Sequence, residues 1–189
     1  MKTFEPGFFD LKNFVKSSKT FSFKEEKDQR TVCHVCYNVN DPFMLIMAAS
    51  AISVIDNNKD MAVHFHIFTD GCSKDNEERV KQLAEKFHCV CSLYELDMKP
   101  FEDFHIKVAR FSRITYGRIY MPKVLKGLTD RFIYVDADAM CVGSLKKLWN
   151  LDLKGFCIGA VAEAPDAIKY RADYLKLKSG KYLMMASCL

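Results

Sequence analysis

Residues 131–138 read Arg-Phe-Ile-Tyr-Val-Asp-Ala-Asp, so two carboxylates follow directly after an apolar run. A short apolar run rich in β-branched and aromatic residues predicts a buried strand over residues 131–135. Side chains at positions i and i+2 of a strand point to the same side, so Asp136 and Asp138 are expected to leave the strand together. Two carboxylates that close repel each other unless a cation or hydrogen bonds compensate.

Paired carboxylate oxygens suit Mg²⁺ or Mn²⁺, and such an ion usually holds substrate phosphates. The position is also suitable, because open α/β sheets bind ligands beyond the carboxyl ends of their strands. The stretch therefore predicts metal and phosphate binding at Asp136 and Asp138. A polar turn after a buried strand is the alternative interpretation.

Strand and helix patterns alternate along the chain before this stretch. Apolar runs predict strands over residues 31–39, 62–69 and 89–96. A mostly apolar run rich in Ala, Met and Ile predicts a buried helix over residues 42–55, and the Ser73 cap with helical periodicity predicts one over 73–87. A third helix is expected over residues 112–125. This alternation predicts an α/β fold with a Rossmann-like, mostly parallel sheet flanked by helices and joined by right-handed crossovers.

The ends of the chain have weaker patterns. Residues 1–30 lack clear periodicity and are expected to form an N-terminal arm, which packs phenylalanines onto a domain of residues 31–189. After Asp138 we expect a short strand over 139–142, a short helix over 143–150 and a strand over 156–162. Residues 164–177 are expected to be helix or loop.

Composition excludes several classes of protein. The 189 residues are 49% hydrophobic with a formal net charge of +4, which is ordinary for one globular domain. No apolar run is long enough to span a bilayer, and no signal-peptide pattern opens the chain, so we expect a cytoplasmic protein. No basic run is interleaved with aromatic residues, which argues against nucleic acid as a partner.

Cysteine and histidine placement favours structural roles. Eight cysteines without an export signal predict buried, reduced thiols. Cys33 and Cys36 would face opposite sides of one strand, which disfavours a zinc site. His64 and His66 alternate along the strand predicted over 62–69, as expected of core or sheet-face residues.

Four motifs, in order along residues 31–182, resemble the retaining glycosyltransferases of family 8, which have the GT-A fold. Residues 132–145 show the family's apolar run, Asp-x-Asp, apolar pair and Gly-Ser-Leu. Residues 112–118 resemble its donor-site helix, residues 36–40 its first-strand turn and residues 159–162 its next strand. The similarity is in particular to bacterial lipopolysaccharide core glucosyl- and galactosyltransferases.

The resemblance implies roles for individual residues. Asp136 and Asp138 would hold Mn²⁺ or Mg²⁺ against the diphosphate of UDP-glucose or UDP-galactose, with Asp136 also near the ribose. Arg118, with Arg113 as a second candidate, would bind the donor. The uridine pocket would be lined, through backbone groups and ring stacking, by Tyr37, Asn38, Val39 and Asn40. The resemblance assigns no catalytic residue.

The implied activity is transfer of glucose or galactose to the lipopolysaccharide core with retention of configuration, with peripheral contact to the inner membrane.

Asn40 and Pro42 depart from the Asp and Asn usual in the family, and a neutral amide bonds uracil more weakly than a carboxylate. The family pattern also stops after residue 182. We therefore expect a chain truncated at its C-terminus, lacking the acceptor part and a histidine metal ligand.

Two alternatives remain open. A truncated remnant would bind a UDP-sugar and transfer nothing. A phosphatase with an aspartyl nucleophile also carries Asp-x-Asp after an apolar strand. That class has Thr or Val where Met140 stands, and its motif usually lies near the start of the domain, which disfavours it here.

Overall fold

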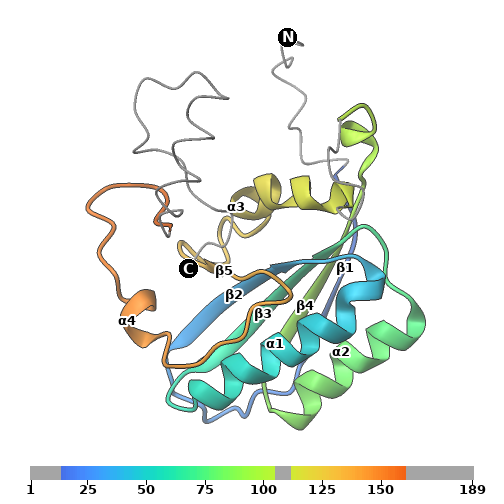
Figure 1. The fold of residues 1–189 in the computed structure, drawn as a ribbon. Helices are drawn as coiled ribbons and strands as arrows, with labels where there is room; N and C mark the ends of the chain where they lie inside the picture. Colours follow the sequence, from blue (N-terminus) through green and yellow to red (C-terminus); the bar gives the residue numbers. More distant parts are fainter. Residues whose placement is uncertain (1–13, 105–111, 161–189) are drawn as a thin grey trace.

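The described part of the chain is built on one sheet. The computed structural model describes residues 14–104 and 112–160. These residues form a five-stranded sheet in the order β1-β4-β3-β2-β5 (Figure 1). The strands are β1 (Val15–Ser22), β2 (Val32–Asn38), β3 (Ala62–Thr69), β4 (Val90–Leu96) and β5 (Ile133–Tyr134). Strands β2, β3, β4 and β5 are parallel, which confirms the predicted α/β class.

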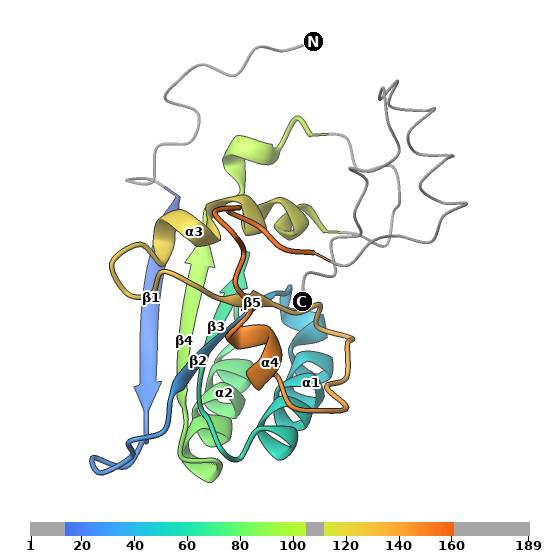
Figure 2. The same ribbon diagram turned by 90° about the vertical axis from the view of Figure 1, so that its left-hand side faces the viewer.

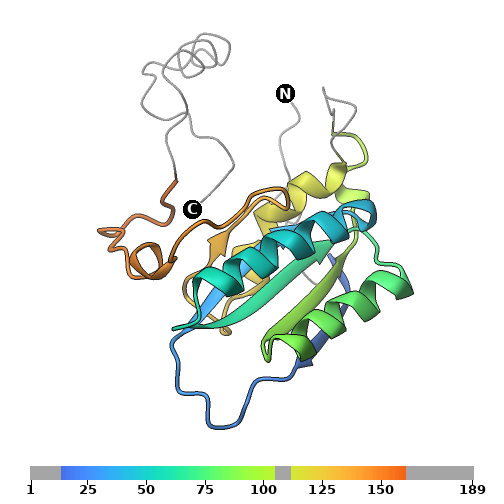
Figure 3. The same ribbon diagram turned by 60° about the horizontal axis from the view of Figure 1, so that its bottom comes forward.

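Two helices cover one face of the sheet. Helix α1 (Met44–Asn57) and helix α2 (Lys74–Lys86) lie side by side on this face (Figure 3). Helix α2 begins where predicted, because the Ser73 side chain accepts a hydrogen bond from the backbone N–H of Asn76. The core here combines alternate strand residues with helix residues spaced by three or four positions, among them Val35, Phe65, Met47, Ala51, Val80 and Ala84.

The opposite face is covered near the carboxyl ends of its strands. The 3-10 helices η2 (Asp41–Phe43) and η3 (Lys99–Phe101) are single turns, whereas η4 (Arg113–Tyr120) continues into the one-turn helix α3 (Met121–Val124). The segment η4–α3 packs on a second apolar cluster that includes Cys36, Phe68, Leu96 and Tyr134. Cys33 belongs to the first core, so the two cysteines face opposite sides as predicted.

The N-terminal edge strand was not predicted. Strand β1 pairs antiparallel with β4 over its whole length (Figure 2). Most of its side chains are exposed, so it has none of the apolar alternation that marks a half-buried strand. Its partner lies about seventy residues further along the chain, as the pair Thr20 and Ser92 shows. Residues 15–22 therefore form a strand because they pair with β4, and not because of a local sequence pattern.

Two strands expected after Asp138 are absent from the described residues. Residues 139–142 run as a loop, because α1 side chains take the backbone groups that a strand would pair. Ser53 Oγ accepts from the N–H of Cys141 at 2.8 Å, and Asn57 Nδ2 donates to its carbonyl at 2.9 Å. The described residues 156–160 contain no strand either. The short helix expected next is confirmed as α4 (Lys146–Trp149), and residues 164–177 lie outside the described part.

Among the described residues, no helix has the length and apolar character needed to span a bilayer.

Candidate functional site

The two aspartates of the Asp-x-Asp motif lie on a turn at the carboxyl edge of the parallel strands. Strand β5 ends at Tyr134, and the backbone N–H of Ala139 donates to the carbonyl of Asp136 at 3.0 Å, which closes the turn. Asp138 is exposed and forms no hydrogen bond or ion pair with the described residues. The pair therefore leaves the sheet on a turn rather than along the extended strand expected from the sequence.

Asp136 is joined to a tyrosine and an arginine. Its Oδ1 accepts a hydrogen bond from the Tyr134 hydroxyl at 2.7 Å and lies 3.9 Å from the Arg118 guanidinium. The same guanidinium stands over the Tyr134 ring, 4.7 Å from its centroid, which is a cation–π contact. The Asp136 side chain remains 35% exposed. A carboxylate held from one side and open on the other can still accept a ligand.

Tyr134 was not among the site residues predicted from the sequence. Its position two residues before Asp136, on a strand in which i and i+2 share a side, is the signal that indicates this contact. Its hydroxyl fixes the orientation of the Asp136 carboxylate. Together with Arg118 it builds the polar rim of the sheet at this point.

The strand β2 anchors the helix that carries Arg118. Asn38, the last residue of β2, donates from Nδ2 to the carbonyl of Ile114 in η4. Arg118 then bonds its own helix, from Nε to the carbonyl of Thr115 at 2.9 Å. Helix η4 approaches the sheet closely at Gly117, where an added Cβ would lie 2.8 Å from Leu96 Cδ1 and 2.9 Å from Asn38 Oδ1.

Replacing Gly117 with alanine is expected to lower the free energy of unfolding by about 1–3 kcal/mol, because the new methyl group overpacks a filled contact. It should also displace η4 and weaken any ligand contact made by Arg118. Urea denaturation measures the first effect. Gly143→Ala is the matched control, since nothing lies within 4 Å of the position of its Cβ. Equal stability of the two variants would contradict the close approach.

The residues expected to line the uridine pocket, 37–40, differ in how deeply their side chains are buried. The Tyr37 ring is fully buried in the core beneath α1, where its hydroxyl lies 2.9 Å from Ser50 Oγ. Val39 is also buried, and its N–H donates to the carbonyl of Phe68 at 2.9 Å. Asn38 and Asn40 are half-buried at the edge of the sheet. Only backbone groups of Tyr37 and Val39 are near this edge. The Asn38 side chain is held under η4, where Nδ2 donates to Ile114 and Oδ1 is buried, so Asn40 is the one of these four residues whose side chain can face a ligand.

Asp41 ties this edge to α2. Its carboxylate accepts from the backbone N–H of Ser73 at 2.7 Å and from Asn76 Nδ2 at 2.8 Å. These hydrogen bonds, led by the one from Ser73, lower the pKa of Asp41. The loop after β2 is therefore fixed to the start of α2.

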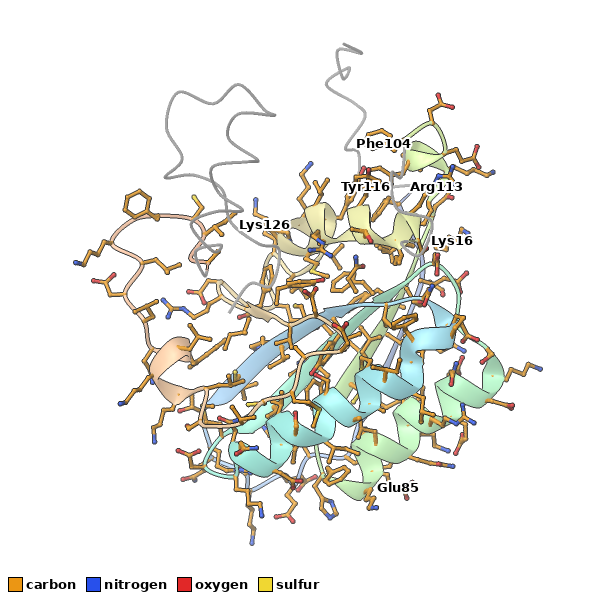
Figure 4. All side chains as sticks on the ribbon, viewed as in Figure 1. Lys16, Glu85, Phe104, Arg113, Tyr116 and Lys126 are labelled. Carbon is orange, nitrogen blue, oxygen red and sulfur yellow. The ribbon has the colours of Figure 1, made fainter. Side chains whose placement is uncertain are left out.

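The two arginines proposed for the donor lie in different surroundings. Arg118 borders a groove of about 1440 Å³ between η4–α3 and residues 148–160, which is large enough for a small organic ligand. Arg113 lines a separate hollow with Asp70, Asp97 and Lys16. Figure 4 shows Arg113 beside Lys16 and Tyr116, at the opposite end of the helical segment from Lys126. The structure thus brings Arg118, and not Arg113, to Asp136.

The sheet order, parallel strands and carboxylate turn define an α/β fold of the GT-A glycosyltransferase class. The crystal structure of galactosyltransferase LgtC with donor and acceptor sugar analogs superposes with a TM-score of 0.69 at 20% identity, over 82% of this chain and 55% of that one. A second LgtC structure, that of an active-site mutant, gives a TM-score of 0.71 at 21% identity, over 82% of this chain and 55% of that one.

The family model for glycosyl transferase family 8 matches residues 34–185. The chain therefore belongs to glycosyltransferase family 8, as its motifs indicated. It is 31% identical over 149 residues to a lipopolysaccharide 1,2-glucosyltransferase of Escherichia coli, covering 77% of this chain and 42% of that protein. It is 27% identical to a lipopolysaccharide 1,3-galactosyltransferase of Salmonella typhimurium, covering 68% of this chain and 38% of that protein. The chain thus spans less than half the length of these two relatives.

Proposed function

We propose that this chain forms the nucleotide-sugar-binding part of a metal-dependent, retaining hexosyltransferase that acts on the lipopolysaccharide core. The observation that carries the proposal is the cluster of Asp136, Arg118 and Tyr134 at the carboxyl edge of a parallel sheet. Membership of family 8 supports the reaction class, and the names of the relatives support glucose or galactose as the sugar.

The carboxylates of this turn are suited to a hard divalent cation. Asp136 Oδ2 accepts no hydrogen bond from the described residues, and Asp138 is exposed with both oxygens unused there. Such oxygens match the ligand preference of Mn²⁺ and Mg²⁺. Bound there, the ion would supply positive charge against the diphosphate of the donor.

Arg118 would supply fixed positive charge at the same place. When a sugar leaves UDP, negative charge grows on the β-phosphate oxygens, and a guanidinium already held in place stabilises that charge without reorganising. Stacking on Tyr134 and the bond from Nε to Thr115 hold the guanidinium in this position. Arg113, in its separate hollow, is the second candidate for the outer part of the donor.

The edge formed by residues 37–40 would receive the uridine. Asn40 would bond it through its side chain, and Tyr37, Asn38 and Val39 through backbone groups. An acceptor on the lipopolysaccharide core implies that the protein works at the cytoplasmic side of the inner membrane, by peripheral contact. Residues 1–30 would act as an arm whose strand β1 adds an edge to the sheet of the domain formed by residues 31–189.

Calorimetric titration tests the donor site. UDP is titrated into the chain with Mn²⁺, with Mg²⁺ and with EDTA. We expect one UDP per chain in the presence of metal and a loss of binding in EDTA, because the diphosphate and the carboxylates repel each other without a cation. UDP binding that EDTA leaves unchanged would contradict a metal-dependent donor site.

Replacing Arg118 with glutamine is expected to weaken UDP binding about 10-fold or more, because a charge-assisted contact to phosphate contributes roughly 1.5–3 kcal/mol. Calorimetry in Mn²⁺ measures the change. Arg79→Gln is a matched control on α2, where the arginine bonds Asn76 Oδ1 at 2.8 Å. The proposed role of Arg118 fails if the two variants bind UDP equally well.

A chain that binds a UDP-sugar without transferring it is the second candidate, and the observation behind it is the 42% and 38% coverage of the two relatives. The two functions differ in one assay. Release of UDP from UDP-glucose or UDP-galactose, with lipopolysaccharide core as acceptor, establishes transfer. Binding of UDP without any release establishes the second candidate.

A further inference from the structure

Three histidines gather on the sheet face opposite α1 and α2. His34 on β2 stands directly beside His64 on β3, and His66 follows on the same side of β3. One ring nitrogen from each of the three lies within 4.8 Å of the others. His66 is fully buried, whereas His34 and His64 are half-buried. The cluster is remote in sequence from Asp136 and Asp138 and shares no residue with their turn.

The three rings already face one another. His34 Nδ1 lies 2.8 Å from His66 Nε2, and the His64 and His66 rings are 4.0 Å apart at their centroids. The side chains come from neighbouring parallel strands, so the sheet itself holds their Cα atoms in place. The three ring nitrogens start within 4.8 Å of one another, so rotation of the side chains would direct them to one point.

Each of two rings has a hydroxyl partner on its outer nitrogen. His66 Nδ1 lies 3.3 Å from the Tyr94 hydroxyl, and His64 Nε2 lies 2.9 Å from Ser92 Oγ. Ser92 Oγ in turn lies 2.8 Å from Thr20 Oγ1 on the edge strand. When a histidine binds a metal, the other ring N–H commonly donates to such a partner, which fixes the tautomer. The inner nitrogens are Nδ1 of His64 and Nε2 of His66, and the second of these would exchange its contact with His34 Nδ1 for a shared ligand.

Burial of the three rings also favours their neutral form, which is the form that binds a metal ion. Burial lowers the pKa of His66 to about 2 and that of His64 to about 4, and it also lowers the pKa of His34. Neutral imidazoles offer a lone pair without losing a proton to solvent.

We infer that His34, His64 and His66 form a binding site for one divalent transition-metal ion, of which Zn²⁺ is the representative. Zinc–nitrogen bonds of about 2.0–2.1 Å in a tetrahedral arrangement separate the nitrogens by about 3.4 Å. The 2.8 Å contact between His34 and His66 would open slightly and the wider spacings would close. Three protein ligands leave the fourth position to solvent, on the half-buried side formed by His34 and His64.

Ligand chemistry separates this site from the aspartate turn. Imidazole nitrogens select Zn²⁺, Co²⁺, Ni²⁺ or Cu²⁺, whereas carboxylate oxygens suit Mg²⁺ and Mn²⁺. The two sites would therefore hold different ions in one protein. This inference does not depend on the proposed donor site.

Cobalt spectroscopy on the 189-residue chain tests the site. The Asp136→Asn, Asp138→Asn variant serves as the background, so that the carboxylate turn takes no ion. We expect one Co²⁺ per chain, with the visible absorption of tetrahedral cobalt and no sulfur-to-cobalt charge-transfer band, and displacement by one equivalent of Zn²⁺. A sulfur band, or no stoichiometric binding, would overturn the inference.

Variants assign the ligands. In the same background, His34→Asn and His66→Asn should each abolish the tetrahedral spectrum. His88→Asn should leave it unchanged, because His88 is exposed and its positive φ of 50° suits asparagine. Tyr94→Phe should weaken Zn²⁺ binding about 10-fold by removing the partner of His66 Nδ1. Retention of the spectrum in either ligand variant would overturn the assignment.

The variants must also fold for this result to count. Far-UV circular dichroism identifies any that do not. Zn²⁺ should raise the melting temperature of the parent chain and of His88→Asn, raise that of Tyr94→Phe less, and leave that of His34→Asn and His66→Asn unchanged. His34→Gln is the second choice at the half-buried position if His66→Asn unfolds. A folded His34→Gln variant that Zn²⁺ still stabilises as strongly as the parent would contradict the site.

Discussion

Replacing both Asp136 and Asp138 with asparagine is expected to abolish metal-dependent binding of UDP while leaving the fold intact. The amide keeps the size of the carboxylate but removes its charge, and a neutral oxygen is a much weaker ligand for Mn²⁺ or Mg²⁺. Loss of residues that merely support a metal ligand costs about 10–100-fold in affinity, so loss of both ligands should exceed about 100-fold. Calorimetry with UDP and Mn²⁺ measures this change.

The turn is placed so that the fold should tolerate the change. Asp138 is exposed, and Asp136 is 35% exposed, with one hydrogen bond from Tyr134 that an asparagine oxygen can also accept. Asp60→Asn is the matched control, because Asp60 pairs with Lys146 at 3.0 Å on the surface. If the double variant binds UDP and Mn²⁺ as tightly as Asp60→Asn does, the carboxylates are not the metal ligands.

Replacing Phe14 with alanine should lower the free energy of unfolding by about 3–5 kcal/mol. The side chain is 1% exposed and stacks on Tyr120, with ring centroids 3.4 Å apart. It also meets Phe101 edge-on at 6.0 Å. A cavity at this point would loosen β1 from the carboxyl end of the sheet and leave η4 without its support. Urea denaturation followed by circular dichroism measures the loss.

Phe21, at the other end of β1, provides the comparison. It is half-buried, so Phe21→Ala should cost clearly less than Phe14→Ala. This difference also tests whether the N-terminal segment is part of the folded domain. A loss below about 1 kcal/mol for Phe14→Ala would mean that the segment contributes little to the stability of the domain.

Local sequence patterns were sufficient to predict the helices and strands in the interior of the fold. Helices α1 and α2 and strands β3 and β4 were predicted nearly to the residue, because an apolar run or a helical repeat of 3.6 residues can be recognised within each segment. The Ser73 cap is equally local, since the hydroxyl and the N–H it accepts are three residues apart. The position of Asp136 and Asp138 after a buried strand follows from the same kind of information.

Long-range pairing could not be derived in this way. Strand β1 exposes most of its side chains and exists because β4 offers a free edge. The loop at Cys141 is held by side chains of α1 some eighty residues earlier, as its hydrogen bonds to Ser53 and Asn57 show. The sequence pattern of one segment does not show either contact, because the two segments that meet are far apart in the sequence.

The sequence by itself determined the α/β class, the parallel strands and the placement of the carboxylates at their end, since each depends on residues close together in the chain. Only the tertiary structure decided which arginine reaches Asp136, and that Tyr37 turns into the core. It alone brought His34 to His66, because adjacent strands join side chains that about thirty intervening residues separate. Contacts of this kind depend on register between elements, which no single segment encodes.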